Sequence, residues 1–190
     1  MKIKIGFFAI FLFLTLMITN SAFFLASVFA VLLHELGHIL MARLCRIRLY
    51  ECSIGIFGAG ITPADSLYSY SREILLCLAG PLMNFLTALF VLWFFPHSSY
   101  FVTSFLFASF SLGLLNLLPI HGFDGGRIFH SLFSLRFSPT VASCLLSSLS
   151  FIFIFLLWAL SVYFLLRARS SLSLFVFSLS LFARIFLSEK

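Results

Sequence analysis

The sequence predicts an all-α, multi-pass membrane protein with about six transmembrane helices and a short membrane-dipping β-hairpin after the second. Of its 190 residues, 62% are hydrophobic and only 9% are charged, whereas soluble domains carry about 25% charged residues. Long apolar segments follow one another along the chain, and one glycine-rich interval interrupts them. A protein with so few polar side chains cannot cover a water-facing surface, so its solvent has to be lipid.

Six apolar segments are candidates for membrane-spanning helices, each of which needs about 20 mostly apolar residues. They run approximately over residues 5–19, 21–44, 72–95, 100–118, 139–166 and 172–187. The first and last are short for a span. Lys2 and Lys4 before the first segment also fit a cleaved signal peptide, but further membrane segments follow directly, so we expect the first segment to be retained.

The basic residues predict the orientation of these spans. With the N-terminus in the cytoplasm, six spans leave ten of the twelve Lys and Arg residues inside and only Arg167 and Arg169 outside. Cytoplasmic loops of membrane proteins carry this excess of basic residues, so both termini are predicted to be cytoplasmic. Arg167 and Arg169 conflict with that pattern. The alternative is that the last segment is not a simple span. The orientation of the spans therefore accounts for the net charge of +6, and no nucleic-acid partner is expected.

Residues 50–70 differ from the apolar segments in their polarity and glycine content. Within them, apolar residues alternate with glycines over 52–62, which indicates a short β-hairpin or a loop that dips into the membrane. An ordinary cytoplasmic loop is the alternative. The four cysteines are scattered without a C-x-x-C pair, so neither a disulfide framework nor a thiolate zinc site is expected. The chain is predicted to be a single domain over 1–190.

The motif His34-Glu35-Leu36-Gly37-His38 is the strongest chemical signal in the sequence. Two histidines four residues apart lie on one face of a helix, where both imidazoles can bind one Zn²⁺. Glu35 beside them is placed to act as a general base. With five His and four Glu in the chain, this pattern arises by chance only about 0.003 times. Ionisable residues inside an apolar segment are also costly, which indicates a functional site.

Two histidines need a third ligand, and Asp124 is the best candidate among the remaining acids. It follows the fourth apolar segment in the run Asn116-Leu117-Leu118-Pro119-Ile120-His121-Gly122-Phe123-Asp124-Gly125-Gly126. Pro119 should end the helix, and a glycine-rich turn should then bring Asp124 back beside the second helix. An aspartate oxygen can complete a three-residue zinc site whose fourth position stays open.

Other polar residues in apolar surroundings are less specific. Asn84 follows a Gly-Pro pair in Ala79-Gly80-Pro81-Leu82-Met83-Asn84, for which we favour helix packing over catalysis. We expect His97 to be a solvated residue without a role in the site. We expect His130 to lie in a stretch at the membrane interface. His121 is three residues before Asp124 and could contact substrate or zinc.

The motifs H-E-L-G-H, A-G-P-L-M-N and N-L-L-P-I-H-G-F-D-G-G, in this order, resemble those of the site-2 protease family of intramembrane zinc metalloproteases. Among its groups, the sequence is most similar to the stage IV sporulation protein FB group, which has six spans, a short hairpin after the second and no PDZ domain. The resemblance covers nearly the whole chain. It departs from the family where Gly122 replaces a usual second proline and where His121 is unusual.

The resemblance implies one zinc ion bound by His34, His38 and Asp124, with Glu35 as general base. It implies that Asn116, the asparagine of the third motif, acts near the substrate or the oxyanion. The implied activity is hydrolysis of a membrane-associated precursor protein in the bacterial cell membrane, such as a pro-sigma factor in a sporulating cell. Neither a PDZ nor a CBS domain is expected.

Two other classes of function compete with this expectation. An inactive pseudoprotease or chaperone would bind transmembrane segments without cutting them, but it should have lost Glu35 or a ligand. A zinc transporter would need metal-binding residues along a path, and the sequence has a single cluster.

Overall fold

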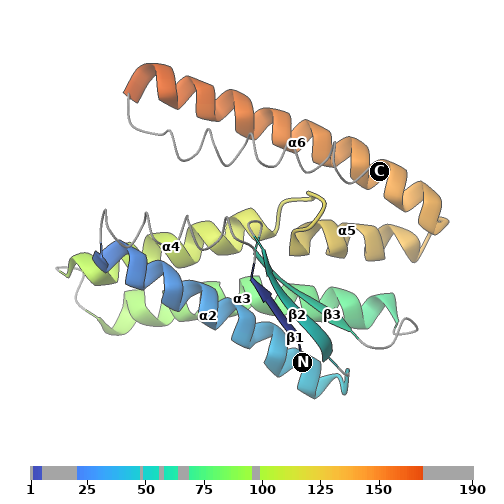
Figure 1. The fold of residues 1–190 in the computed structure, drawn as a ribbon, viewed down its shortest axis with the longest axis horizontal. Helices are drawn as coiled ribbons and strands as arrows, with labels where there is room; N and C mark the ends of the chain where they lie inside the picture. Colours follow the sequence, from blue (N-terminus) through green and yellow to red (C-terminus); the bar gives the residue numbers. More distant parts are fainter. Residues whose placement is uncertain are drawn as a thin grey trace.

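The computed structural model describes residues 2–5, 21–47, 49–55, 58–63, 69–95 and 99–168. These residues form helices and a small sheet (Figure 1). In chain order the elements are β1 (Lys2–Ile5), α2 (Ser21–Leu44), β2 (Leu49–Gly55), β3 (Gly58–Pro63), α3 (Tyr70–Phe94), α4 (Tyr100–Asn116), α5 (Asp124–Ser134) and α6 (Pro139–Ala168).

Small residues allow α2, α3 and α4 to pack closely against one another. Ala26 and Ala30 of α2 are buried against Phe105 of α4. At Gly37 of α2, an added Cβ would lie 2.5 Å from the carbonyl oxygen of Ala79 in α3. The backbones of α2 and α3 therefore touch at this point, as is common where membrane helices meet through small residues.

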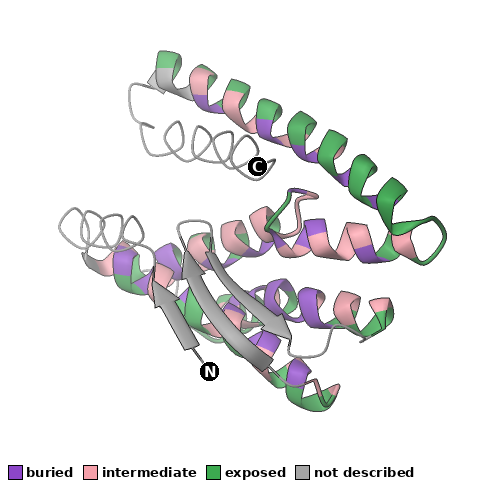
Figure 2. Ribbon diagram, turned by 45° about the vertical axis from the view of Figure 1, so that its right-hand side comes forward, coloured by how far each residue is buried: buried purple, intermediate pink, exposed green. Residues whose placement is uncertain are grey.

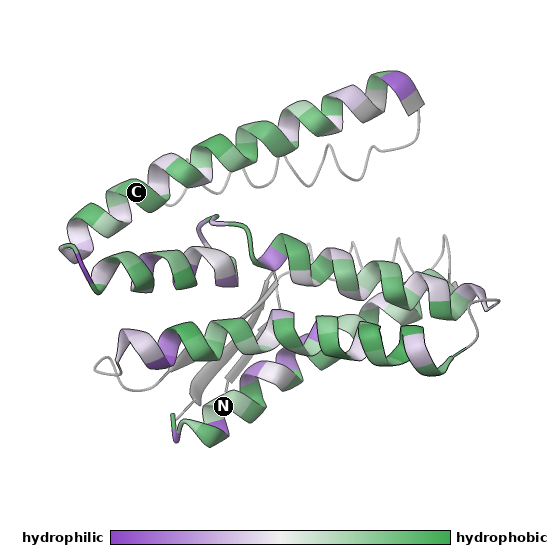
Figure 3. Cartoon of the chain, turned by 180° about the vertical axis from the view of Figure 1, so that it is seen from behind, coloured by the Kyte–Doolittle hydropathy of each residue, from purple (hydrophilic) through white to green (hydrophobic). Residues whose placement is uncertain are grey.

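Most residues of the long helices are hydrophobic (Figure 3), and many of the large apolar side chains are exposed. Large side chains such as Trp93 and Leu166 remain 81% and 79% exposed. Within the described residues, three helices are long and apolar enough to cross a membrane: Ala22–Leu44, Tyr70–Phe94 and Pro139–Tyr163. The second, third and fifth predicted segments are thus confirmed as helices of spanning length.

The remaining predicted spans have different outcomes. The fourth corresponds to α4, which is apolar but has only 17 residues. It stops at Asn116 rather than at residue 118, because the chain turns before Pro119, whose ring cannot continue a helix. The predicted spans at 5–19 and 172–187 lie outside the described residues, except that Ile5 ends strand β1.

A three-stranded sheet is drawn next to α2 in Figure 1. Its strand order is β1-β2-β3. Strands β2 and β3 pair antiparallel from Leu49 opposite Pro63 to Gly55 opposite Gly58, in the interval for which a hairpin or loop was predicted. Strand β1 pairs with β2 in parallel. A parallel pair needs a long crossover connection, and α2 is part of it.

The chain after α4 corrects one prediction about the third motif. Asp124 does not lie on a glycine-rich turn but is the first residue of helix α5. A Cβ on Gly125 would overlap the carbonyl group of Leu117, and one on Gly126 would overlap that of Ile120. These two glycines therefore serve to pack the first turn of α5 tightly against the loop that precedes it.

Helix α6 packs along α5 and holds the 117–123 loop from the other side. Ile154 of α6 is buried in one cluster with Ile120 and Phe123 of the loop. The Ser150 hydroxyl donates to the Pro119 carbonyl at 3.3 Å and accepts the His121 backbone N–H at 3.0 Å. Most of the remaining α6 surface is exposed (Figure 2), as expected for a helix that faces lipid.

Candidate metal centre

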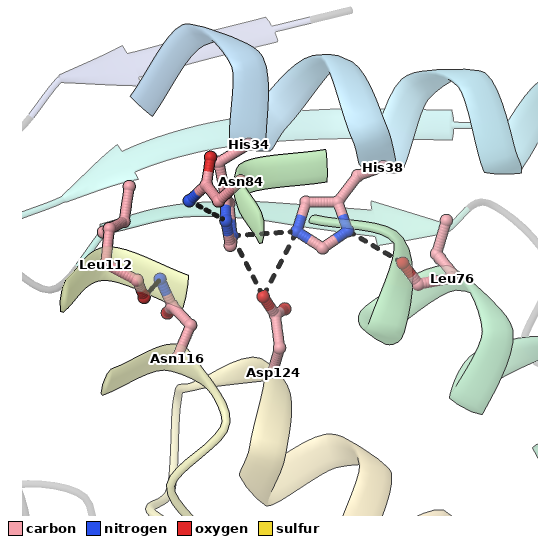
Figure 4. A network of polar contacts seen from close by, with 7 residues as sticks. All are labelled: His34, His38, Leu76, Asn84, Leu112, Asn116 and Asp124. Atoms are coloured by element: carbon pink, nitrogen blue, oxygen red, sulfur yellow. Dashed lines mark hydrogen bonds and ion pairs between the residues drawn. The ribbon is translucent and has the colours of Figure 1, made fainter. Parts of the chain in front are cut away.

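His34 and His38 lie one helical turn apart on α2 and point toward the same space (Figure 4). Their ring centroids are 4.8 Å apart and the ring planes are nearly perpendicular, at 82°. The two Nε2 atoms are 3.2 Å apart, and both side chains are buried. Two imidazole nitrogens thus converge from one face of α2, as the four-residue spacing predicts.

Asp124 faces the two histidines from the start of α5. Its Oδ2 atom is 3.0 Å from Nε2 of His34 and 3.2 Å from Nε2 of His38. The potential ligand atoms of these three residues all lie within 4.8 Å of one another. Burial disfavours the charged form of Asp124, but hydrogen bonds with both imidazoles lower its pKa to about 2. The positive end of the α5 dipole also favours a carboxylate at this position.

Two groups of α3 contact the sides of the imidazoles that face away from Asp124. Nδ1 of His38 lies 2.8 Å from the backbone carbonyl oxygen of Leu76. Nδ1 of His34 lies 3.2 Å from the side-chain amide nitrogen of Asn84, which is fully buried. Such partners orient a metal-binding imidazole and decide which nitrogen carries the proton.

Glu35 lies next to His34 in the chain, and its carboxylate is largely enclosed. Its Oε2 atom is buried and has no hydrogen-bond partner among the described residues. A buried carboxylate oxygen without a partner is costly, so this atom is available to a water molecule or substrate group that enters the site.

Gly80 of α3 forms the wall of the site opposite α2. A Cβ at this residue would overlap Nε2 of His38 and would lie 2.8 Å from Nε2 of His34. Only glycine leaves enough room here for both imidazoles to stay in their positions. Gly80, from the Gly-Pro pair that the sequence associated with helix packing, therefore lines the candidate metal centre.

An ion pair holds α5, and with it Asp124, against α3. Arg127 Nε donates to Glu73 Oε1 at 3.2 Å, and the Ser131 hydroxyl donates to Glu73 Oε2 at 2.9 Å. Arg127 is only one helical turn after Asp124, so the orientation of Asp124 depends on this attachment. The sequence had assigned Arg127 only a topological role.

The other residues that the sequence singled out are not part of this cluster among the described residues. Asn116 donates its amide N–H to the Leu112 carbonyl at 3.1 Å, within its own helix (Figure 4). The His121 ring pairs with Ser147 of α6 at 3.1 Å. The His130 ring pairs with Ser143 of α6 at 3.1 Å. His97 lies outside the described residues.

Sequence reasoning also missed the two groups that contact Nδ1 of the histidines. The Leu76 carbonyl could not be identified, because every residue has one and only the crossing of α2 and α3 selects it. Asn84 carried a usable signal, since an amide inside an apolar segment needs a partner. The sequence alone did not identify His34 as this partner.

The comparisons with known proteins identify the family and the fold of this chain. The sequence matches the model of Peptidase family M50 over residues 22–100 and 96–160, and the chain belongs to that family. Its structure is similar to that of the Site-2 Protease from Methanocaldococcus jannaschii, with a TM-score of 0.68 and 22% sequence identity. The alignment covers 100% of this chain and 92% of that one. No match was found among the curated proteins.

Family and fold together define a metalloendopeptidase of the site-2 protease type. Enzymes of this family are zinc metalloproteases. The donor set of two imidazoles and one carboxylate fits a catalytic zinc ion, which takes three protein ligands and keeps one position open.

Proposed function

We propose that this chain is an intramembrane endopeptidase in which His34, His38 and Asp124 hold one zinc ion and Glu35 is the general base. The observation that carries the proposal is the convergence of the three potential ligands within 4.8 Å. The buried, unpartnered Oε2 of Glu35 supports it.

Each residue of the proposed site has a separate role in peptide hydrolysis. A bound zinc ion would polarise the scissile carbonyl and activate a water molecule for attack. Glu35 accepts the proton of the attacking water and passes it to the leaving amine. Asn116 is the candidate for stabilising the developing oxyanion. Because its amide nitrogen now donates to Leu112, this role requires the side chain to turn toward the substrate.

The substrate in this proposal is a membrane-associated precursor protein. A carbonyl within a substrate helix is hydrogen-bonded and shielded, so the scissile segment has to unwind before attack. The sheet β1-β2-β3 beside α2 offers edges to which an extended segment can add as a further strand. The similarity to the stage IV sporulation protein FB group makes a pro-sigma factor of a sporulating cell the preferred substrate.

The proposed orientation places both termini and the access to the site on the cytoplasmic side. The excess of basic residues on that side supports it. Reporter fusions after Lys190 measure the orientation directly. An exported C-terminus would rule out the arrangement of six spans with both ends in the cytoplasm.

Glu35→Gln is the test that separates a protease from a membrane chaperone with the same zinc site. The amide cannot accept the proton of the attacking water, so this variant should keep zinc and lose cleavage of a co-expressed membrane precursor. Ser27→Ala is a matched control on the same helix, because within the described part of the chain the Ser27 hydroxyl donates to the Phe23 carbonyl of its own helix. Cleavage by Glu35→Gln at the wild-type rate would exclude Glu35 as the base.

A further inference from the structure

The side chain of Asn84 is a fully buried amide in the middle of the apolar helix α3. Its Nδ2 atom lies 3.2 Å from Nδ1 of His34. Its Oδ1 atom has no hydrogen-bond partner among the described residues. An amide with one end on a metal-site histidine and the other end unsatisfied is costly as a packing residue alone.

The two histidines differ in what their Nδ1 atoms can do. Nδ1 of His38 faces the Leu76 carbonyl oxygen at 2.8 Å, which can only accept a hydrogen bond. Neutral His38 therefore carries its proton on Nδ1 and keeps a lone pair on Nε2. Because the partner is backbone, this tautomer is set by the fold and is the one that a metal ion on Nε2 requires.

His34 instead faces a group that can either donate or accept. In the arrangement described here, Asn84 Nδ2–H donates to His34 Nδ1. The proton of neutral His34 is then on Nε2, directed at Asp124 Oδ2 at 3.0 Å. A metal ion bound at Nε2 would require this proton to be on Nδ1, where it needs an acceptor. Rotation of the Asn84 amide by about 180° supplies one, because its Oδ1 then takes the place of Nδ2.

We propose that Asn84 is a positioning residue that sets the tautomer of His34, its amide donating in the metal-free protein and accepting in the zinc-bound protein. This inference rests on the proposed zinc site. It assigns Asn84 a role that neither helix packing nor direct catalysis describes. The Leu76 carbonyl already holds His38 in the tautomer that a metal ion on Nε2 requires. His34 adopts this tautomer only when the Asn84 amide turns.

The test compares zinc affinity, measured by chelator competition in detergent, in three Asn84 variants and one control. Asn84→Leu keeps the approximate shape but cannot accept, and it should weaken zinc binding about 10- to 100-fold. Asn84→Asp can only accept, and it should bind zinc within about threefold of the wild type or more tightly. Asn84→Ala should resemble Asn84→Leu. Ser109→Ala removes another fully buried polar side chain, in α4, and should leave affinity unchanged.

Histidine-selective ¹⁵N NMR provides a readout that a packing role does not affect. The His34 resonance should change from the Nε2–H to the Nδ1–H tautomer when zinc is added to the wild type. In Asn84→Asp, the Nδ1–H tautomer should be present before zinc is added.

The outcomes separate this inference from the proposed function. Wild-type zinc affinity in Asn84→Leu, or equal losses in Asn84→Leu and Asn84→Asp, would overturn the tautomer role while leaving the zinc site intact. Failure of the wild-type protein to bind zinc would overturn the proposed function instead. If Asn84→Leu does not fold, Asn84→Asp and the NMR signal decide the question.

Discussion

Replacing Gly80 with alanine should strongly weaken metal binding while preserving the fold. The added Cβ would lie 2.8 Å from Nε2 of His34 and 2.6 Å from Cε1 of His38. Nonbonded heavy atoms settle at about 3.5 Å or more. Both imidazoles therefore have to retreat, that of His34 by about 0.7 Å and that of His38 by at least about 0.9 Å, which are the differences between that separation and the two distances.

A displacement of this size is large for a metal ligand, whose distance to the metal is defined to about 0.2 Å. We expect zinc affinity to fall by more than about 100-fold, because even changes to residues behind the ligands cost 10- to 100-fold. The helix itself should not suffer, since alanine is favoured over glycine by about 1 kcal/mol in a helix interior. Metal binding and fold stability should thus change independently.

The assay is zinc content after gel filtration in detergent, together with chelator competition and thermal unfolding. Gly113→Ala is the matched control, because a Cβ there would meet the edge of the Phe85 ring at 3.0 Å and would lie at an ordinary van der Waals distance of 3.5 Å from Cβ of Asn84. That ring can rotate, so zinc affinity should stay within about threefold of the wild type. If Gly80→Ala binds zinc as tightly as the wild type does, the positions deduced here for the two imidazoles are wrong.

Three further predictions concern the ligands and the elements that carry them. His34→Ala should reduce zinc content from about one ion per chain to none, and full retention by elemental analysis would contradict the ligand assignment. Glu73→Gln should weaken zinc binding about two- to fivefold, because it removes a partly exposed ion pair worth up to about 1 kcal/mol. In a double-mutant cycle, Arg127→Gln should then add nothing further, and additive losses would exclude coupling through this pair. Gly122 has a φ angle of 91°, which proline cannot adopt, so Gly122→Pro should displace Asp124 and lose zinc, whereas Gly122→Ala should keep zinc with a lower unfolding temperature.

Gly122 also accounts for the departure of this chain from the family motif. A second proline at this position would hold φ near −65°, and the loop would have to follow another path to α5. In this chain the loop takes a left-handed turn at Gly122 and is held by Ser150 of α6 through the Pro119 carbonyl. With this turn at Gly122, Asp124 reaches the histidines.

The sequence by itself determined the class of protein and the identity of the converging side chains. Composition requires a lipid environment, and this conclusion needs no coordinates. The spacing of His34 and His38 places both on one helix face by geometry alone. Asp124 could be selected because so few acids occur in the chain and because helix-breaking residues precede it.

Only the tertiary structure decided what surrounds these side chains. The crossing of α2 and α3 places the Leu76 carbonyl on His38, the Asn84 amide on His34 and Gly80 against both rings. These contacts join residues about 40 to 50 positions apart, and no local pattern specifies them. The helical start of α5 at Asp124 likewise depends on contacts across the fold, because Glu73 of α3 fixes α5 through Arg127. From local propensity we predicted a turn in this glycine-rich stretch, but tertiary packing stabilises a helix there.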